Sequence, residues 1–348
     1  MLQVRGYATK DSSLPLEPFD FERREPGPHD VVVDIQFCGV CHSDIHQARN
    51  EWGGSMYPLV PGHEIVGTAT MVGKEVRKFK VGSSVGVGTF VDSCRSCGPC
   101  KKGEEQYCEK GAIFTYNSYE RDGKSLTQGG YSTRITVDEA YAFTIPKGMA
   151  PQKTAPLLCA GTTTYSPMRH FGVKENSRVA VVGLGGLGHM AVKFAKAMGA
   201  STTVLSHSPE KEGDAGRLGA DGFITTRDST VFEKYSSSFD FVLDTVSAKH
   251  DFNFYLNMLA YDGTMVLLGV PEPSPVAPSS LQGRRVRLIG SNVGGTKDTQ
   301  EMLEFCTRHG ITADVEVIPM QRINEAFDRT VRSDVHYRFV IDMASLKS

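Results

Sequence analysis

The amino-acid sequence predicts an α/β protein of two domains, with a β-rich domain followed by a doubly wound parallel sheet. Its 348 residues suffice for about two domains of roughly 100–200 residues each. Before about residue 150, short strand-like runs such as VVVDIQF and SVGVGTF alternate with Gly, Pro and Asp turns. After it, apolar runs alternate with helix-like stretches, which is the pattern of a parallel sheet covered by helices.

The composition excludes several classes of function. With 40% hydrophobic and 22% charged residues and a net charge of −2, the chain resembles a globular protein and lacks the basic stripe of a nucleic-acid binder. The N-terminal stretch MLQVRGYATK has no signal-peptide pattern, and no apolar run approaches the ~20 residues that span a bilayer. We therefore expect a cytoplasmic protein with neither nucleic acid nor membrane as partner.

Four of the eight cysteines lie in one short stretch, CRSCGPCKKGEEQYC. In a reducing compartment, clustered thiols bind metal more often than they form disulfides, and four sulfur ligands describe a closed structural zinc site. An iron–sulfur cluster is an alternative, because C-x2-C-x2-C also opens ferredoxin motifs, but here seven residues separate the fourth cysteine and no Pro follows it. A disulfide pair is the other alternative. We predict structural zinc on Cys94, Cys97, Cys100 and Cys108.

Six strand candidates follow one another in the second half of the chain. The first begins at Arg178 and leads through glycines into a helix-like segment, where apolar residues recur at i, i+3, i+4, i+7, i+8 and i+11. The remaining candidates are TTVLSH, DGFITT, FDFVLDTVS, GTMVLLGV and VRLIGSN. Strands and helices in this order match a doubly wound sheet. The apolar helix positions are Leu187, Met190, Ala191, Phe194, Ala195 and Met198.

The glycine-rich turn after the first of these strands reads G-x-G-x-x-G. In such a turn Gly183 permits a tight bend, Gly185 lets the backbone approach a pyrophosphate, and Gly188 lets helix and strand pack closely. A glycine-rich turn that binds nothing is the alternative, but the strand before it and the helix after it favour a dinucleotide site. The predicted cofactor-binding residues of this turn are Gly183, Gly185, Gly186, Leu187 and Gly188.

The residue that would contact the adenosine ribose favours NADP(H) over NAD(H). It should end the second strand about 20 residues past the glycines, and Ser206 stands 18 residues after Gly188 where an NAD enzyme would have Asp or Glu. A serine does not repel a 2′-phosphate. Ser206 and Ser208 can donate hydrogen bonds to that phosphate, and Lys211 can add a counter-charge. An ordinary polar loop is the alternative.

A second set of metal ligands is spread over the first half of the chain. Cys41 lies in GVCHSDIH, His63 lies beside Glu64 in PGHE, and Cys159 lies in LLCAG. A catalytic zinc takes three protein ligands and leaves a fourth position open, which a Cys2His set would satisfy. Spacing alone does not select these three residues, because only the fold can bring them together.

Five motifs together carry a resemblance to a known family. GVCHSDIH, YPLVPGHEIVG, the four-cysteine stretch, LLCAGTTTYSP and VVGLGGLGH occur in the order and approximate spacing of the zinc-dependent medium-chain alcohol dehydrogenases. Within that family, the sequence is similar to the NADP-dependent cinnamyl alcohol dehydrogenase and aldehyde reductase branch. The resemblance covers essentially the whole chain. It implies a GroES-like catalytic domain made of residues 1–157 and 295–348, and a Rossmann NADP-binding domain over residues 158–294.

The resemblance also implies the roles of individual residues. Catalytic zinc would be bound by Cys41, His63 and Cys159, and the cysteines from Cys94 to Cys108 would bind the second, structural zinc. Cys38 and Cys306 match no ligand position and are expected to be buried as small apolar residues. The other implied roles are Glu64 as an occasional zinc ligand, Ser43 as proton relay with His46 at its surface end, Asp44 as hydrogen-bond partner of the zinc-ligand histidine, His42 at the pyrophosphate, Thr163 near the nicotinamide, and Trp52 and Phe90 at the substrate pocket. For Trp52 and Phe90 the alternative is that both are ordinary core aromatics.

The implied activity is the reversible reduction of aldehydes, aromatic or cinnamyl-type favoured, to primary alcohols with NADPH. Zinc has no redox chemistry, so it polarises the carbonyl while the nicotinamide supplies the hydride. A zinc polyol dehydrogenase is the nearest alternative, although that branch commonly has Glu where this chain has Cys159. A zinc-stapled NADP-binding protein without catalysis and a nucleic-acid-binding zinc module are further alternatives. The family also implies a homodimer, for which VRLIGSNVGG is the candidate edge strand.

Overall fold

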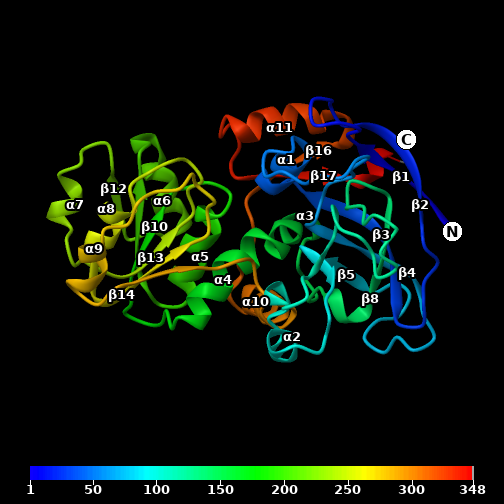
Figure 1. Ribbon diagram of the computed structural model, residues 1–348, viewed down its shortest axis with the longest axis horizontal. Coiled ribbons are helices and arrows are strands. Elements are labelled where there is room, and N and C mark those ends of the chain that lie inside the picture. The colour runs from blue at the N-terminus through cyan, green and yellow to red at the C-terminus, as the bar shows by residue number, and fades with distance from the viewer. Residues whose placement is uncertain (347–348) are drawn as a thin grey trace. The chain divides into compact units, whose positions relative to one another are not determined.

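The computed structural model describes residues 1–346, which fold as two compact units (Figure 1). One unit consists of Met1–Thr162 together with the segment that starts at Gly294, and the other of Thr163–Val293. The chain therefore leaves the first unit, forms the second, and returns to complete the first. No helix among the described residues is long and apolar enough to cross a membrane.

The second unit is built on a six-stranded parallel sheet, which confirms the predicted doubly wound fold. All six predicted strands form, because strands buried on both faces read as continuous apolar runs. The strand order β12-β11-β10-β13-β14-β15 reverses direction between β10 and β13, which is where such sheets bind ligands at the carboxyl ends of their strands. The strands are β10 Arg178–Val182, β11 Ser201–Ser206, β12 Gly222–Thr225, β13 Phe239–Asp244, β14 Leu259–Leu267 and β15 Arg287–Gly290.

Short helices connect these strands. The predicted apolar stripe lies on α5, where Met190, Ala191, Phe194 and Ala195 are fully buried, while Leu187 and Met198 flank the helix and are half-buried. The buried rings of Phe194 and Tyr165 pack edge to face with their centroids 5.5 Å apart, and this contact helps to attach α4 to this unit. The helices are α4 Ala160–His170, α5 Gly188–Ala197, α6 Glu212–Leu218, α7 Val231–Lys234, α8 Phe252–Asn257 and α9 Pro278–Gln282, with a 3-10 turn at Pro209–Lys211.

The first unit is rich in strands, as predicted. Its main sheet has seven strands in the order β16-β17-β3-β4-β5-β9, with β8 pairing β3, and only β16 and β17 are parallel. The run VVVDIQF is the centre of β3, whose valines are fully buried. The strands are β1 Leu2–Ala8, β2 Glu17–Arg23, β3 Asp30–Gly39, β4 Ile65–Val72, β5 Ser84–Val87, β6 Phe90–Asp92, β7 Ile113–Phe114, β8 Arg134–Asp138, β9 Ala142–Thr144, β16 Val315–Pro319 and β17 Arg338–Asp342.

The first unit has fewer helices than strands. Only two residues separate the end of β3 at Gly39 from the first residue of α1, His42, so the loop between them is tight. The helices are α1 His42–Ala48, α2 Gly98–Lys102, α3 Pro151–Thr154, α10 Thr296–His309 and α11 Ile323–Val331, with 3-10 turns at Glu105–Tyr107, Glu139–Tyr141, Ala155–Leu158, Met320–Arg322 and Met343–Leu346.

Candidate metal and cofactor sites

The fold of the first unit gathers one group of metal-binding side chains from three distant segments. Cys41 caps the start of α1, His63 and Glu64 immediately precede β4, and Cys159 follows a 3-10 turn. Their donor atoms all lie within 4.8 Å of one another and all four side chains are buried. The Sγ atoms of Cys41 and Cys159 are 3.9 Å apart. This cluster contains the predicted Cys2His ligand set, and Glu64 joins it as a fourth donor.

The chemistry of this cluster fits a zinc ion. Two sulfur atoms, one imidazole and one carboxylate are the donor types that zinc prefers. A hydrogen bond from the Cys159 thiol lowers the pKa of Cys41 well below its usual value, with Arg338 and His63 adding positive charge. Among the described residues, Glu64 Oε2 is buried and has no hydrogen-bond partner. A buried orphaned acceptor is costly, and a metal ion would satisfy it.

The carboxylate of Asp44 accepts hydrogen bonds that position the residues of this cluster. Its Oδ1 accepts hydrogen bonds from the backbone N–H of Gly62 at 3.0 Å and from His63 Nδ1 at 3.1 Å. Its Oδ2 accepts the backbone N–H of Cys41 at 2.9 Å and the hydroxyl of Tyr131 at 3.0 Å. Because Nδ1 of His63 donates to this carboxylate, Nε2 keeps the free lone pair that a metal requires.

Arg338 is a further residue of this site, and the sequence reasoning missed it. It lies on β17 and its Nη2 donates to Glu64 Oε1 in a fully buried ion pair. Burial raises the pKa of Glu64 to about 8, and the charge of Arg338 opposes that rise. A Cβ atom at Gly39 would stand 1.9 Å from Glu64 Oε2, so the end of β3 must be glycine. Arg338 belongs to no motif and lies 274 residues from Glu64.

The predicted relay residues lie on α1, beside the cluster. Ser43 Oγ is 3.7 Å from Cys41 Sγ. His46 is partly exposed, its Nδ1 contacts Glu51 and its ring is 4.7 Å from that of Trp52. Trp52 is 46% exposed. Phe90 is buried and packs edge-on against Tyr141 at 6.1 Å. Glu51 is a partner of His46 that the sequence reasoning did not identify.

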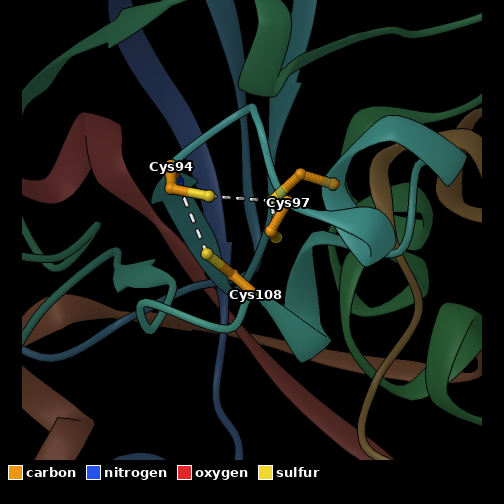
Figure 2. A group of neighbouring side chains, drawn as sticks. Cys94, Cys97 and Cys108 are labelled. Atoms are coloured by element: carbon orange, nitrogen blue, oxygen red, sulfur yellow. Dashed lines mark hydrogen bonds between the residues drawn. The ribbon is translucent and has the colours of Figure 1, made fainter.

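The second metal cluster consists of the four cysteines of the predicted structural site. Figure 2 shows the side chains of Cys94, Cys97 and Cys108 close together, and Cys100 Sγ lies 3.9 Å from Cys94 Sγ and 3.3 Å from Cys97 Sγ. All eight cysteines are free thiols, so a disulfide is not what joins them. Backbone N–H donation from Ser96 lowers the pKa of Cys94 to about 5. Four close thiols with one already acidic fit a closed tetrahedral zinc site.

Hydrogen bonds fasten this cysteine loop to the rest of its unit. Ser93 Oγ lies 3.1 Å from Cys100 Sγ and 2.7 Å from the hydroxyl of Tyr141. Glu105 accepts the backbone N–H of Thr296 at 2.9 Å and its hydroxyl at 2.8 Å, at the first residue of α10. The hydrogen bonds between Glu105 and Thr296 thereby join two segments that are 191 residues apart in the sequence. This is the geometry of a structural site.

The glycine-rich turn of the second unit has the geometry that its sequence predicts. Gly183 has φ +86, in the left-handed region, and a Cβ atom there would stand 2.7 Å from Val246 Cγ2. A Cβ atom at Gly188 would stand 2.1 Å from the carbonyl oxygen of Gly183. At Gly185, by contrast, no described heavy atom lies within 4 Å of the Cβ position. The turn therefore leaves open space at the one glycine where a pyrophosphate would approach the backbone.

The serine loop after β11 lies next to this turn. Ser206 ends the strand and its Oγ accepts the backbone N–H of Ser208 at 3.1 Å. Lys211 Nζ donates to the carbonyl oxygen of Leu184 at 3.0 Å, so this cation reaches back to the glycine turn. Arg227 Nε donates to the carbonyl oxygen of His207 at 2.9 Å and is a second cation that the sequence reasoning missed.

The last two predicted cofactor contacts come from different units. His42 is the first residue of α1 in the first unit and is exposed. Thr163 is the first residue of the second unit and is buried in α4. Their assignment to a cofactor stays a prediction.

Comparisons with known proteins agree with both metal clusters. Residues 27–147 match the family described as alcohol dehydrogenase GroES-like domain, and residues 186–308 match the family described as zinc-binding dehydrogenase. The chain is 53% identical to the NADP-dependent alcohol dehydrogenase C of Mycobacterium tuberculosis, over 99% of this chain and 100% of that one. It is 52% identical to a probable mannitol dehydrogenase of Fragaria ananassa, over 99% and 96%. The solved structure of a cinnamyl alcohol dehydrogenase from Sorghum bicolor superposes with a TM-score of 0.96 at 44% identity, over 99% and 98%.

We expect Cys108→Ser to remove the structural zinc and lower the melting temperature strongly, because structural zinc can contribute on the order of 10 kcal/mol to folding. Zinc per chain, measured by inductively coupled plasma mass spectrometry, should fall by one equivalent. Cys306→Ala is the matched control: it removes a buried thiol outside both clusters and should leave the zinc content unchanged. A Cys108→Ser protein with full zinc content and an unchanged melting temperature would contradict the assignment.

Proposed function

Because the chain belongs to the zinc-dependent medium-chain alcohol dehydrogenase family, we propose that it reversibly reduces aldehydes to primary alcohols with NADPH, preferring aromatic and cinnamyl-type aldehydes. The observation that carries this proposal is the buried donor set of Cys41, His63, Glu64 and Cys159 in a chain that also has a complete dinucleotide turn. A metal site alone would fit a hydrolase as well; the turn adds the means to move a hydride.

In this proposal one domain binds the metal and the other binds the cofactor. When bound, zinc polarises the substrate's oxygen and stabilises its developing charge, and NADPH supplies the hydride. Cys41, His63 and Cys159 would hold the metal, and Glu64 would offer it a further donor. In this proposal the first unit is the catalytic domain, which extends to Thr162 where the sequence predicted residue 157, and the second unit, Thr163–Val293, is the cofactor-binding domain.

Three residues of α1 are proposed to transfer the substrate's proton and to orient the metal-ligand histidine, His63. Asp44 fixes the tautomer of His63 through the 3.1 Å contact with Nδ1. The Ser43 hydroxyl, 3.7 Å from Cys41 Sγ, transfers a proton to or from the substrate oxygen. His46 is the partly exposed end of this relay, and its contact with Glu51 orients the ring.

The cofactor is proposed to be NADP(H). The pyrophosphate would lie against Gly183, Gly185, Gly186, Leu187 and Gly188 at the start of α5, with His42 contributing from α1 and Thr163 contacting the nicotinamide. Ser206, Ser208 and Lys211 would bind the 2′-phosphate, since no carboxylate stands at the end of β11 to repel it. The name of the mycobacterial relative supports the same choice.

The aldehyde preference rests on aromatic side chains. Trp52 and Phe90 are the proposed pocket residues, and the name of the sorghum enzyme agrees with a cinnamyl-type substrate. The relative named probable mannitol dehydrogenase keeps a polyol as the second candidate substrate class. Cys159, where polyol dehydrogenases commonly have Glu, favours the aldehyde.

The first experiment is therefore an initial-rate comparison on protein of measured zinc content. Cinnamaldehyde, benzaldehyde and a short aliphatic aldehyde are each tested with NADPH and NADH, and mannitol is tested with NADP⁺. We expect the fastest rates with NADPH and the aromatic aldehydes. Turnover of mannitol alone would assign the polyol activity instead. Absence of turnover with two zinc ions per chain would refute the aldehyde proposal.

We predict that Ser206→Asp shifts cofactor preference toward NADH. The new carboxylate would repel the 2′-phosphate and accept hydrogen bonds from the ribose hydroxyls, so the NADPH/NADH ratio of kcat/KM should fall by about 100-fold, or ~2.7 kcal/mol. Ser201→Asp is the matched control, because Ser201 begins the same strand at its opposite end. An unchanged ratio in Ser206→Asp would show that this loop does not contact the phosphate.

The chain is also proposed to form a homodimer through β15. This strand lies at the edge of the six-stranded sheet, and an edge strand offers unpaired backbone groups to a second copy. Light scattering should give twice the mass of the chain. A monomer across the micromolar range would contradict this interface.

A cytoplasmic location is proposed because both metal clusters need reduced thiols. All eight cysteines are free, as expected in a reducing compartment. Cell fractionation with an antibody against the native chain would test this. Recovery in an oxidising compartment would contradict it.

A further inference from the structure

His250 has no role in the proposed function. It closes a loop at the carboxyl end of β13 in the second unit. His250 Nε2 lies 2.7 Å from Asp244 Oδ2, and His250 Nδ1 lies 2.7 Å from the carbonyl oxygen of Ala248. Asp244 ends β13 and is 1% exposed. The segment 244–250 is thus a closed loop, fastened at its two ends by one side-chain contact.

The partners of this ring fix its protonation state. A carbonyl oxygen only accepts hydrogen bonds, so Nδ1 must carry a proton, and the Asp244 carboxylate requires a proton on Nε2 as well. The other oxygen of Asp244 accepts the backbone N–H of Val246 at 3.0 Å, as a carboxylate does. With both nitrogens donating, His250 is an imidazolium held by a buried carboxylate.

The loop that this ion pair closes packs directly on the glycine-rich turn. Thr245 Oγ1 donates to the carbonyl oxygen of Val182 at 2.8 Å, and the backbone N–H of Thr245 donates to the same oxygen at 3.1 Å. Val246 fills the space where a Cβ atom of Gly183 would stand, at 2.7 Å. On its other side, the carbonyl oxygen of Val246 would be only 2.2 Å from a Cβ atom at Gly269. The loop is therefore held between two glycines, and a displacement of the loop would move the turn.

We propose that His250, as an imidazolium paired with Asp244, is a positioning residue for the dinucleotide, which holds the 245–250 loop against the glycine-rich turn and makes cofactor affinity depend on pH. This inference rests on the proposed function, because it assumes that the turn binds a nicotinamide dinucleotide. The pair acts on the pyrophosphate part of the site, which NADPH and NADH share.

The groups around His250 determine the direction of the pH effect. Asp244 faces the ring from β13, and Asp251 and Tyr255 face it from the start and middle of α8, the Tyr255 ring at 5.5 Å. Lys249 is engaged with Glu272 at 3.7 Å. Burial lowers the pKa of His250, but the hydrogen bond and charge of Asp244 outweigh it and raise the pKa above its ordinary value. The pair is therefore intact at lower pH and is lost as pH rises through the raised pKa of the folded protein.

The test is the dissociation constant of NADPH and of NADH, measured by fluorescence on the zinc-loaded protein between about pH 6 and pH 9. We expect the wild type to bind both dinucleotides about tenfold more weakly at the high end than at the low end. His250→Gln should bind weakly at all pH values, without this slope. His250→Lys, which keeps a positive charge across the range, should bind without a slope but more tightly than His250→Gln.

Controls separate this inference from other titrations and from misfolding. His309→Gln changes an exposed histidine of α10 and should keep the wild-type slope. A slope with NADPH but none with NADH would assign the titration to the 2′-phosphate and overturn the inference. If His250→Gln does not fold, judged by its melting temperature, Asp244→Asn removes the same charge pair, and an Asp244→Asn slope equal to that of the wild type overturns the inference. Wild-type protein that binds neither dinucleotide would refute the proposed function itself.

Discussion

The carboxylate of Asp44 is the contact on which the metal site depends. It is fully buried and accepts four hydrogen bonds, from Cys41, Gly62, His63 and Tyr131. A buried charge is tolerated only when it is fully hydrogen-bonded, and here each bond also fixes a part of the site. The two backbone donors hold the loop that carries the first zinc cysteine and the loop that carries the zinc histidine. The ring donor selects the tautomer that can bind metal.

Glycines allow the segments of this site to approach one another. Gly62 has φ +101, and a Cβ atom there would stand 2.6 Å from the ring of Tyr131, the residue whose hydroxyl reaches Asp44. Gly39 makes room for the Glu64 carboxylate in the same way. A side chain at either position would push a ligand-bearing segment away from the cluster, so the metal geometry depends on the absence of two Cβ atoms as much as on the donors.

Local patterns in the sequence predicted more of the fold than of the site. The six parallel strands were predictable because each is a continuous apolar run, and the buried face of α5 because its spacing is helical. The four-cysteine loop was predictable because all its ligands lie within one stretch. The catalytic ligands were selected only through the family resemblance, since Cys41 and Cys159 are 118 residues apart. Arg338 and Tyr131 belong to no motif, and their hydrogen bonds to Glu64 and Asp44 join segments that only the fold brings together.

Two pairs of aspartate and histidine, Asp44 with His63 and Asp244 with His250, serve different purposes in this protein. Both carboxylates are buried, both accept a backbone N–H, and both accept a hydrogen bond from a histidine ring. The difference lies at the second nitrogen of each ring. The second nitrogen of His63 is left as a lone pair among metal-binding donors, so this ring is neutral when it coordinates zinc. The second nitrogen of His250 faces the carbonyl oxygen of Ala248, so this ring is charged whenever its first nitrogen also donates to Asp244. The first pair orients a metal ligand, whereas the second holds a loop by an ion pair that can titrate.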